Sequence, residues 1–540
     1  YYDRMNKFVR WNWENTLSYT KTFNQHSITG IIGITLFKEF SENVWAKKQD
    51  LIFDNLEKAY LDNAQLPNAE AGGGFGEHTL GSYFGRVNYN YAEKYLLEAV
   101  LRIDGSSRFG ADNRYAYFPA VSAGWVLSKE SFFPQSQVFN FAKLRFSWGQ
   151  NGNESIGDFR YTTLINSNNI YFYGLNQTMV NGIQPNRYPN PALVWETSEQ
   201  LTIGTDLAFL SNRITLGLDY YDKRTKDWLI EESNASYPLL IGNVGPVINA
   251  GEVQNSGVEI ELGYKQNFTK DLFLSVSFTG SHNRSKILSL ENENGYILGA
   301  GGIHGQSNIL RLEVDNPLGY FHLVQTDGVF QTQEEIDNYV DASGRRIQPR
   351  AEPGDLKFID IDSSGTIGDE DRVNAGTPYP KFIAGLNLTL DWKGIDFSMF
   401  WYTALGHQIY NATRRYDLQY ANFTTGVLDR WNGEGTSTTH PRVTLADPNL
   451  TYKTASDYFL EDADYLRLKN LTIGYTLPSQ ITSRVNIDRF RIYVTAENLL
   501  TFTKYTGMEV EMGGGPLDIG IDRGVYPQPK TFLVGLQIGF

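Results

Sequence analysis

The chain has 540 residues, a formal net charge of −14 and no cysteine. A disulfide framework and a thiolate metal site are therefore excluded, and the acidic balance argues against nonspecific binding of nucleic acid. Aromatic residues are abundant, at 33 Tyr, 32 Phe and 10 Trp, and glycine is frequent. No run of about 18 apolar residues is present, so we expect no transmembrane helix. This composition is typical of an outer-membrane β-barrel, although a soluble β protein of several domains would share much of it.

Apolar and polar residues alternate along many segments, for example over 382–392. A period of two indicates strands with a different environment on each face. The parity changes between Leu468 and Leu471, which predicts a β-bulge near Asn470. The alternation predicts about 17 strands. They are expected near 8–22, 26–37, 81–91, 95–105, 116–127, 141–150, 195–208, 213–224, 253–265, 272–285, 305–315, 318–329, 380–392, 394–404, 465–476, 489–502 and 528–540.

The predicted connections alternate in length. Short ones such as 92–94 and 393–394 separate long ones such as 151–194 and 405–464. Tight periplasmic turns opposite long external loops are typical of outer-membrane barrels. We therefore expect an all-β fold, an antiparallel transmembrane β-barrel in a bacterial outer membrane. Large plugged barrels have about 22 strands, so residues 1–540 would hold strands roughly 6 to 22.

Short motifs follow one another from about Ser82 to the end of the chain. Three of them are RIDGSSRFG at 102–110, YFPAVSAGW at 117–125 and YLRLKNLTIGY at 465–475. Others lie at 85–89, 94–99, 252–259, 353–358, 495–499 and 526–532. In this order, the motifs resemble those of the SusC/RagA-type TonB-dependent transporters of Bacteroidetes.

The resemblance implies a barrel that imports a large nutrient, a glycan or an oligopeptide, across the outer membrane. It implies an N-terminal plug and first strands, a SusD-like surface lipoprotein as a lid, and energy from the TonB–ExbB–ExbD complex. Residues 1–540 contain no candidate plug domain or TonB box, so we expect the C-terminal barrel portion. No motif indicates an enzyme. The alternative is a surface β protein that binds glycans without transporting them.

One motif suggests a metal site. Residues 360–371 fit a 12-residue calcium loop, with Gly365 at the position of the sharp turn. The loop lies within the predicted external connection 330–379, and calcium there would be structural. Its oxygen ligands would come from Asp360, Asp362, Ser364, the Thr366 carbonyl and Asp371. The alternative is a solvated acidic turn without an ion.

Aromatic residues in the long loops are candidates for contact with a substrate, because flat rings stack on sugars and on apolar side chains. The candidates are Tyr171, Tyr173, Tyr416, Tyr420 and Trp431. Packing among the loops is the favoured alternative for them. The histidines stand apart along the chain and lack metal-ligand spacing.

Overall fold

The computed structural model describes residues 1–540 except for 54, 65–68, 135, 137, 164, 186, 232–244, 293, 300, 303–304 and 421. Over this part of the chain, 15 strands are hydrogen-bonded in one sheet, and each lies next to the sheet strand that follows it in sequence. They are β1 (Tyr2–Phe23), β2 (His26–Lys47), β3 (Glu70–Tyr91), β4 (Tyr95–Ser106), β5 (Tyr115–Val126), β6 (Phe139–Asn153), β9 (Glu196–Phe209), β10 (Ile214–Lys226), β13 (Gly251–Thr269), β14 (Leu272–Leu290), β21 (Phe382–Trp392), β22 (Ile395–Leu405), β25 (Tyr465–Thr476), β26 (Arg489–Thr503) and β28 (Thr531–Gly539).

The prediction of about 17 strands was wrong at two places. The segments 305–315 and 318–329 are not in the large sheet. They form the short strands β16 (Leu310–Glu313), β17 (Tyr320–Val324) and β18 (Thr326–Val329). All five residues of β17 are buried, because this strand packs inside a folded connection. Apolar content alone cannot separate such a strand from one in the large sheet.

The chain divides into two compact units. Unit 1 comprises residues 1–133, 143–203 and 223–252, and unit 2 comprises 134–142, 204–222 and 253–540. The strands β1 to β6 are paired antiparallel in succession. The strands β14, β21, β22, β25, β26 and β28 are paired in the same way.

The predicted alternation of short and long connections is confirmed except at β5, where the connection before the strand (107–114) is shorter than the one after it (127–138). At one end β21 and β22 are joined by Lys393 and Gly394, both at positive φ, as a two-residue hairpin turn requires. At the other end long connections carry structure of their own. They run over 48–69, 154–195, 227–250, 291–381, 406–464 and 504–530.

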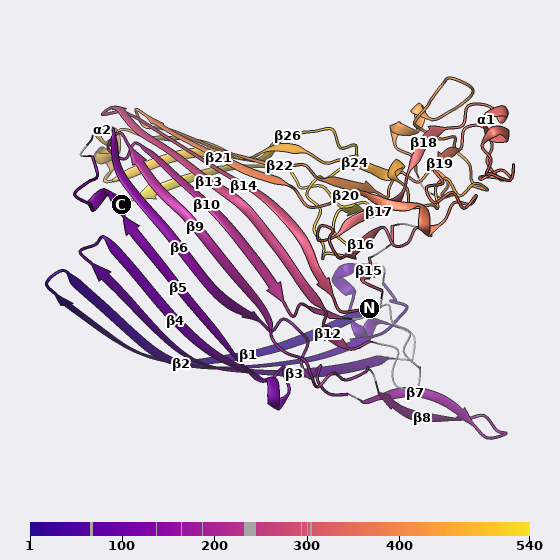
Figure 1. Cartoon of the computed structure of the whole chain (residues 1–540), viewed down its shortest axis with the longest axis horizontal. Helices are drawn as coiled ribbons and strands as arrows, with labels where there is room; N and C mark the ends of the chain where they lie inside the picture. Colours follow the sequence, from indigo (N-terminus) through magenta and orange to yellow (C-terminus); the bar gives the residue numbers. More distant parts are fainter. Residues whose placement is uncertain are drawn as a thin grey trace. The chain divides into compact units, whose positions relative to one another are not determined.

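The long connections contain most of the short elements. In Figure 1 the strands β16 to β20 lie beyond one end of β21 and β22. The remaining short elements are β7 (Ile165–Tyr173), β8 (Thr178–Pro185), β11 (Leu229–Glu231), β12 (Val247–Asn249), β15 (Tyr296–Leu298), α1 (Gln333–Asn338), β19 (Leu356–Phe358), β20 (Arg372–Gly376), β23 (Gln408–Asn411), β24 (Leu460–Asp462), α2 (Ser479–Thr482) and β27 (Ile521–Asp522). No helix among the described residues is long and apolar enough to cross a bilayer.

The predicted bulge near Asn470 is confirmed. The register of β25 shifts between Leu468 and Asn470 against both of its neighbours. The extra residue keeps Leu468 and Leu471 on one face of the sheet, although an odd number of positions separates them.

Candidate functional site

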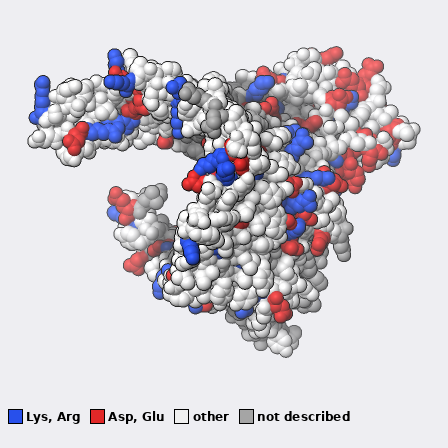
Figure 2. Space-filling model, turned by 60° about the vertical axis from the view of Figure 1, so that its left-hand side comes forward, with Lys and Arg blue, Asp and Glu red and all other residues white. Residues whose placement is uncertain are grey.

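One face of the sheet in unit 1 is apolar. The register places Val87, Ala99, Val121 and Trp148 in one row across β3 to β6. The next row holds Tyr89, Leu97, Ala123 and Phe146. Many large side chains on this face are exposed, including Val87, Leu97, Val121 and Phe146. Figure 2 shows wide uncharged areas on the visible surface. A broad apolar surface of this kind suits the hydrocarbon layer of a bilayer.

Unit 2 has a corresponding apolar face. A row across β14, β21, β22 and β25 holds Val276, Leu388, Met399 and Leu471. At the far edge, Val494 of β26 faces Val534 of β28. The opposite, polar face carries a row of hydroxyl side chains, Ser275, Thr389, Ser398 and Thr472.

Aromatic rings line the short-turn end of the apolar face in unit 1. The rings of Tyr91 and Tyr95 are stacked with centroids 6.2 Å apart, and those of Tyr95 and Trp125 with centroids 6.4 Å apart. Both Tyr95 and Trp125 donate hydrogen bonds to Glu130, at 2.6 and 3.1 Å. Rings with an apolar body and a polar tip belong at the membrane–water boundary.

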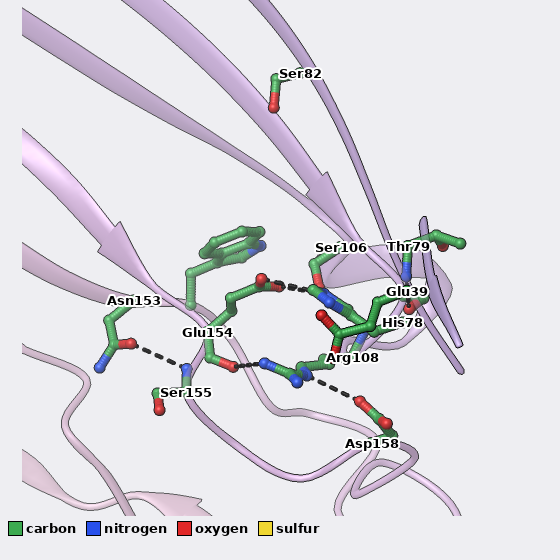
Figure 3. A network of polar contacts seen from close by, with 12 residues as sticks. Glu39, His78, Thr79, Ser82, Ser106, Arg108, Asn153, Glu154, Ser155 and Asp158 are labelled. Carbon is green, nitrogen blue, oxygen red and sulfur yellow. Dashed lines mark hydrogen bonds and ion pairs between the residues drawn. The ribbon is translucent and has the colours of Figure 1, made fainter. Parts of the chain in front are cut away.

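The polar face of unit 1 ends, on the long-connection side, in a partly buried network (Figure 3). The ring of His78 lies 3.1 Å from a carboxylate oxygen of Glu154, and Arg108 donates to the Glu154 carbonyl at 3.2 Å. The same guanidinium binds Asp158 at 2.9 Å. Burial by itself would raise the pKa of Glu154, but hydrogen bonds from His78 and Ser106 lower it. The network fastens the start of the connection 154–195 to His78 of β3 and to Arg108, just after the end of β4.

In unit 2, the connections 291–381, 406–464 and 504–530 share a hydrophobic core. Phe321, Tyr410, Tyr452 and Phe459 are fully buried. The other buried members are Ile309, Leu310, Leu323, Val324, Val329, Leu356, Phe358, Ala412, Tyr416, Ala455, Tyr458 and Ile521. We call this group of connections the loop module. Its size explains why such long connections are ordered.

A buried histidine belongs to the loop module. The Nε2 atom of His322 lies 3.2 Å from Nη1 of Arg311. A guanidinium can only donate, so Nε2 accepts and the ring is neutral. Burial and the charges of Arg311 and Arg372 lower the pKa of His322 to about 4.

The five aromatic candidates are divided between packed and exposed positions. Tyr416 is buried in the core of the loop module, and Trp431 packs against that core and donates to Gln331 at 3.2 Å. These two positions agree with the packing alternative. Tyr420 is 94% exposed. Tyr171 and Tyr173 are exposed on the β7–β8 hairpin.

The candidate calcium loop connects β19 to β20 within the loop module. Carboxylate oxygens of Asp360, Asp362 and Asp371 lie within 4.8 Å of one another. Asp371 is almost completely buried, and its two oxygens accept the N–H groups of Ile361 and Gly368, both at 2.8 Å. The hydroxyl of Ser364 donates to the Thr366 carbonyl at 3.1 Å. All five predicted ligands therefore belong to one compact turn of oxygen donors, which fits a hard cation.

A further carboxylate lies beside this turn. Gly365 adopts φ 81°, and a Cβ atom there would lie 2.7 Å from Oδ2 of Asp341. Asp341 also pairs with Arg345 at 2.9 Å. The sequence motif does not include Asp341, because this residue precedes the motif and comes close only through the fold.

Comparison with known proteins identifies the family. The family model described as TonB dependent receptor-like, beta-barrel matches residues 1–499. The chain belongs to this family. The strands of the large sheet are thus strands of an outer-membrane protein, and the predicted family and location are confirmed.

Two relatives and one solved structure show the extent of the similarity. TonB-dependent receptor P3 of Formosa agariphila is 32% identical over 536 residues, which cover 98% of this chain and 52% of that protein. TonB-dependent receptor SusC of Bacteroides thetaiotaomicron is 31% identical over 471 residues, or 86% of this chain and 44% of SusC. The RagAB peptide transporter matches the fold with a TM-score of 0.80 at 23% identity, over 100% of this chain and 56% of that one. The chain thus spans about half the length of these proteins.

Proposed function

We propose that the chain forms the C-terminal wall and external loops of an active outer-membrane importer of the SusC/RagA type. The main support is that the sheet has one apolar face and one polar face, in a member of the TonB-dependent receptor family. An apolar face suits lipid, and a polar face suits a path for a water-soluble nutrient.

The proposal places the 15 strands at the C-terminal end of a barrel. Transporters with a plugged lumen have about 22 strands, so these would be strands roughly 8 to 22. The earlier strands and the plug would come from the preceding part of the same protein. Energy would arrive there through TonB.

The long connections would lie outside the cell, where a SusD-like lipoprotein would cover them. The nutrient would be large, a glycan or an oligopeptide. Calcium, held by Asp360, Asp362, Ser364, Thr366 and Asp371, would have a structural role. It would offset the repulsion among three carboxylates and fix the turn between β19 and β20.

The test is nutrient uptake by intact cells. Cells that express the full-length protein and its neighbouring lipoprotein should accumulate their nutrient, and deletion of TonB should abolish the accumulation. Binding at the cell surface that persists unchanged without TonB, with no uptake in either strain, would instead favour a glycan-binding surface protein.

A further inference from the structure

The polar face of unit 2 contains a groove of about 350 Å³. Small residues form its floor, namely Thr279 of β14 and Gly385 of β21, which lie opposite each other in the register. Gly385 in turn lies opposite Tyr402 of β22. Glu259 and Glu261 of β13 line one side, and Phe400 and Tyr402 line the other. Thr279 and Gly385 leave room between these two walls, and Ile383 of β21 also lines the groove.

Register and contacts show which face the groove occupies. Tyr402 and Phe400 alternate with Trp401 and Met399, and Met399 pairs with Leu388 on the apolar face. On β13, the side chain of Ile260 points to the apolar face, because its Cγ2 atom lies 3.2 Å from the Cβ position of Gly280. Glu259 and Glu261 therefore point to the polar face.

The two glutamates give the groove its charge. Both side chains are exposed. In the described part of the chain, no lysine, arginine or histidine forms an ion pair with Glu259 or Glu261. Each carboxylate can therefore accept a cation from a ligand.

A second hollow of about 520 Å³ lies beside the aromatic wall. Tyr402 lines both hollows, and its ring is tilted against that of Tyr465 with centroids 6.0 Å apart. The remaining lining is mostly apolar and includes Ile409, Val510 and Met512. Lys469 and Glu511 form an ion pair of 2.5 Å at the same hollow. An apolar hollow with a few convergent polar groups is the usual form of a ligand site.

We propose that the groove and the hollow together bind a peptide with one basic and one apolar side chain. The inference rests on the proposed function, and it selects oligopeptides over neutral glycans as the nutrient. The basic group would form an ion pair with Glu259 or Glu261. The apolar side chain would pack in the hollow beside Tyr402 and Tyr465. A neutral sugar would leave both carboxylates without a charged partner.

The strand spacing sets the separation of the two side chains. β13 and β22 are three strand spacings apart in the sheet order, which is about 14 Å. An extended peptide advances about 3.4 Å per residue. The basic and apolar side chains should therefore be about four positions apart.

Binding to the purified full-length transporter with its lipoprotein would test the proposal. The probe is a glycine–serine peptide with one lysine and one phenylalanine about four positions apart. The comparison peptide has glutamate instead of lysine. We expect the lysine peptide to bind about tenfold more tightly at low ionic strength, and added salt should reduce the difference.

Variants assign the effect to residues. The double variant Glu259→Gln and Glu261→Gln should remove most of the preference for lysine, whereas Tyr402→Ala should weaken both peptides equally. Asp271→Asn, a loss of one carboxylate at the turn between β13 and β14, is the matched control and should change nothing. Normal heat-modifiable mobility in SDS would show that each variant is folded.

Two results would overturn the inference. One is equal affinity of the wild-type protein for both peptides, and the other is a lysine preference that survives in the double glutamine variant. TonB-dependent uptake of a neutral oligosaccharide with no peptide binding would also refute the peptide site, while the proposed function would stand. If cells that express the wild-type protein and its lipoprotein show no TonB-dependent uptake of any nutrient, the proposed function itself is refuted.

Discussion

Acidification should loosen the loop module through His322. The folded state holds this ring neutral, with its pKa lowered from 6.5 to about 4 by burial and by Arg311 and Arg372. Between these two values the unfolded chain binds more protons than the folded chain. The stabilising contribution of the neutral ring is therefore complete above pH 6.5 and is lost as the pH falls toward 4.

The linkage relation gives the size of this effect. With those two pKa values, the folded loop module loses about 2 kcal/mol by pH 5 and about 3 kcal/mol by pH 4, relative to neutral pH. Protonation would also place an N–H group against the Arg311 guanidinium, because Nε2 now accepts from it. Both effects act on β17 and on the strands beside it.

Hydrogen exchange of the full-length protein, measured by mass spectrometry, would report this opening. The free energy of opening for peptides that cover β16 and β17 should fall between pH 7 and pH 5, after correction for the intrinsic exchange rate. Peptides from β4, which lies in the large sheet, serve as an internal control.

A variant isolates the histidine from other acids. Burial raises the pKa of Asp447 and of Asp457 in the same module, and this acts in the opposite direction on acidification. His322→Gln keeps an acceptor for Arg311 but cannot titrate. Between pH 7 and pH 5, the free energy of opening of β16 and β17 should fall by about 2 kcal/mol more in the wild-type protein than in this variant. The reasoning fails if the two proteins lose protection in parallel.

Three further outcomes are expected. Leu388→Arg should cost about 2–4 kcal/mol, because the side chain would enter lipid; folded protein in the outer membrane should fall, and a spin label there that reports water would show that the face is assigned wrongly. Asp371→Ala should loosen the turn between β19 and β20, because the N–H groups of Ile361 and Gly368 lose their acceptor; exchange in 360–371 should then no longer slow when calcium is added, and a calcium response equal to that of the wild-type protein would exclude Asp371 as a ligand. Protease added to intact cells should cut near the fully exposed Leu175, between β7 and β8, and spare Lys393; the reverse pattern would invert the topology.

The sequence predicts features that depend on neighbouring residues. The turn at Lys393 and Gly394, the bulge near Asn470 and the cluster within 360–371 all come from residues close together in the chain. The two strand errors have a different cause. Segment 318–329 has the composition of a strand, and it forms strands, but their partners belong to the loop module.

The groove on the polar face was beyond prediction for a related reason. It depends on Thr279, Gly385 and Tyr402 meeting across three strands. Residues 279 and 385 are separated in sequence by the whole connection 291–381. A single sequence gives the parity of each strand but not its register against a partner so distant. The same limit applies to Asp341 beside the candidate calcium turn.

Buried ion pairs favour one packing of the loop module over others. Arg415 and Asp417 are almost fully buried and pair at 2.7 Å, and Arg442 pairs with the fully buried Asp355 at 2.7 Å. Such pairs add little net stability, but loss of one partner costs about 3–5 kcal/mol. They therefore penalise alternative packings more than they stabilise the native one.

The β7–β8 hairpin has the opposite character. Ile170, Phe172, Met179 and Ile183 point to one of its faces and are all more than half exposed. A two-stranded ribbon is marginal in water without further burial. The hairpin should be ordered only while a partner covers that face, so its exchange protection should follow the presence of the lipoprotein, and equal protection with and without the lipoprotein would show that the hairpin stands alone.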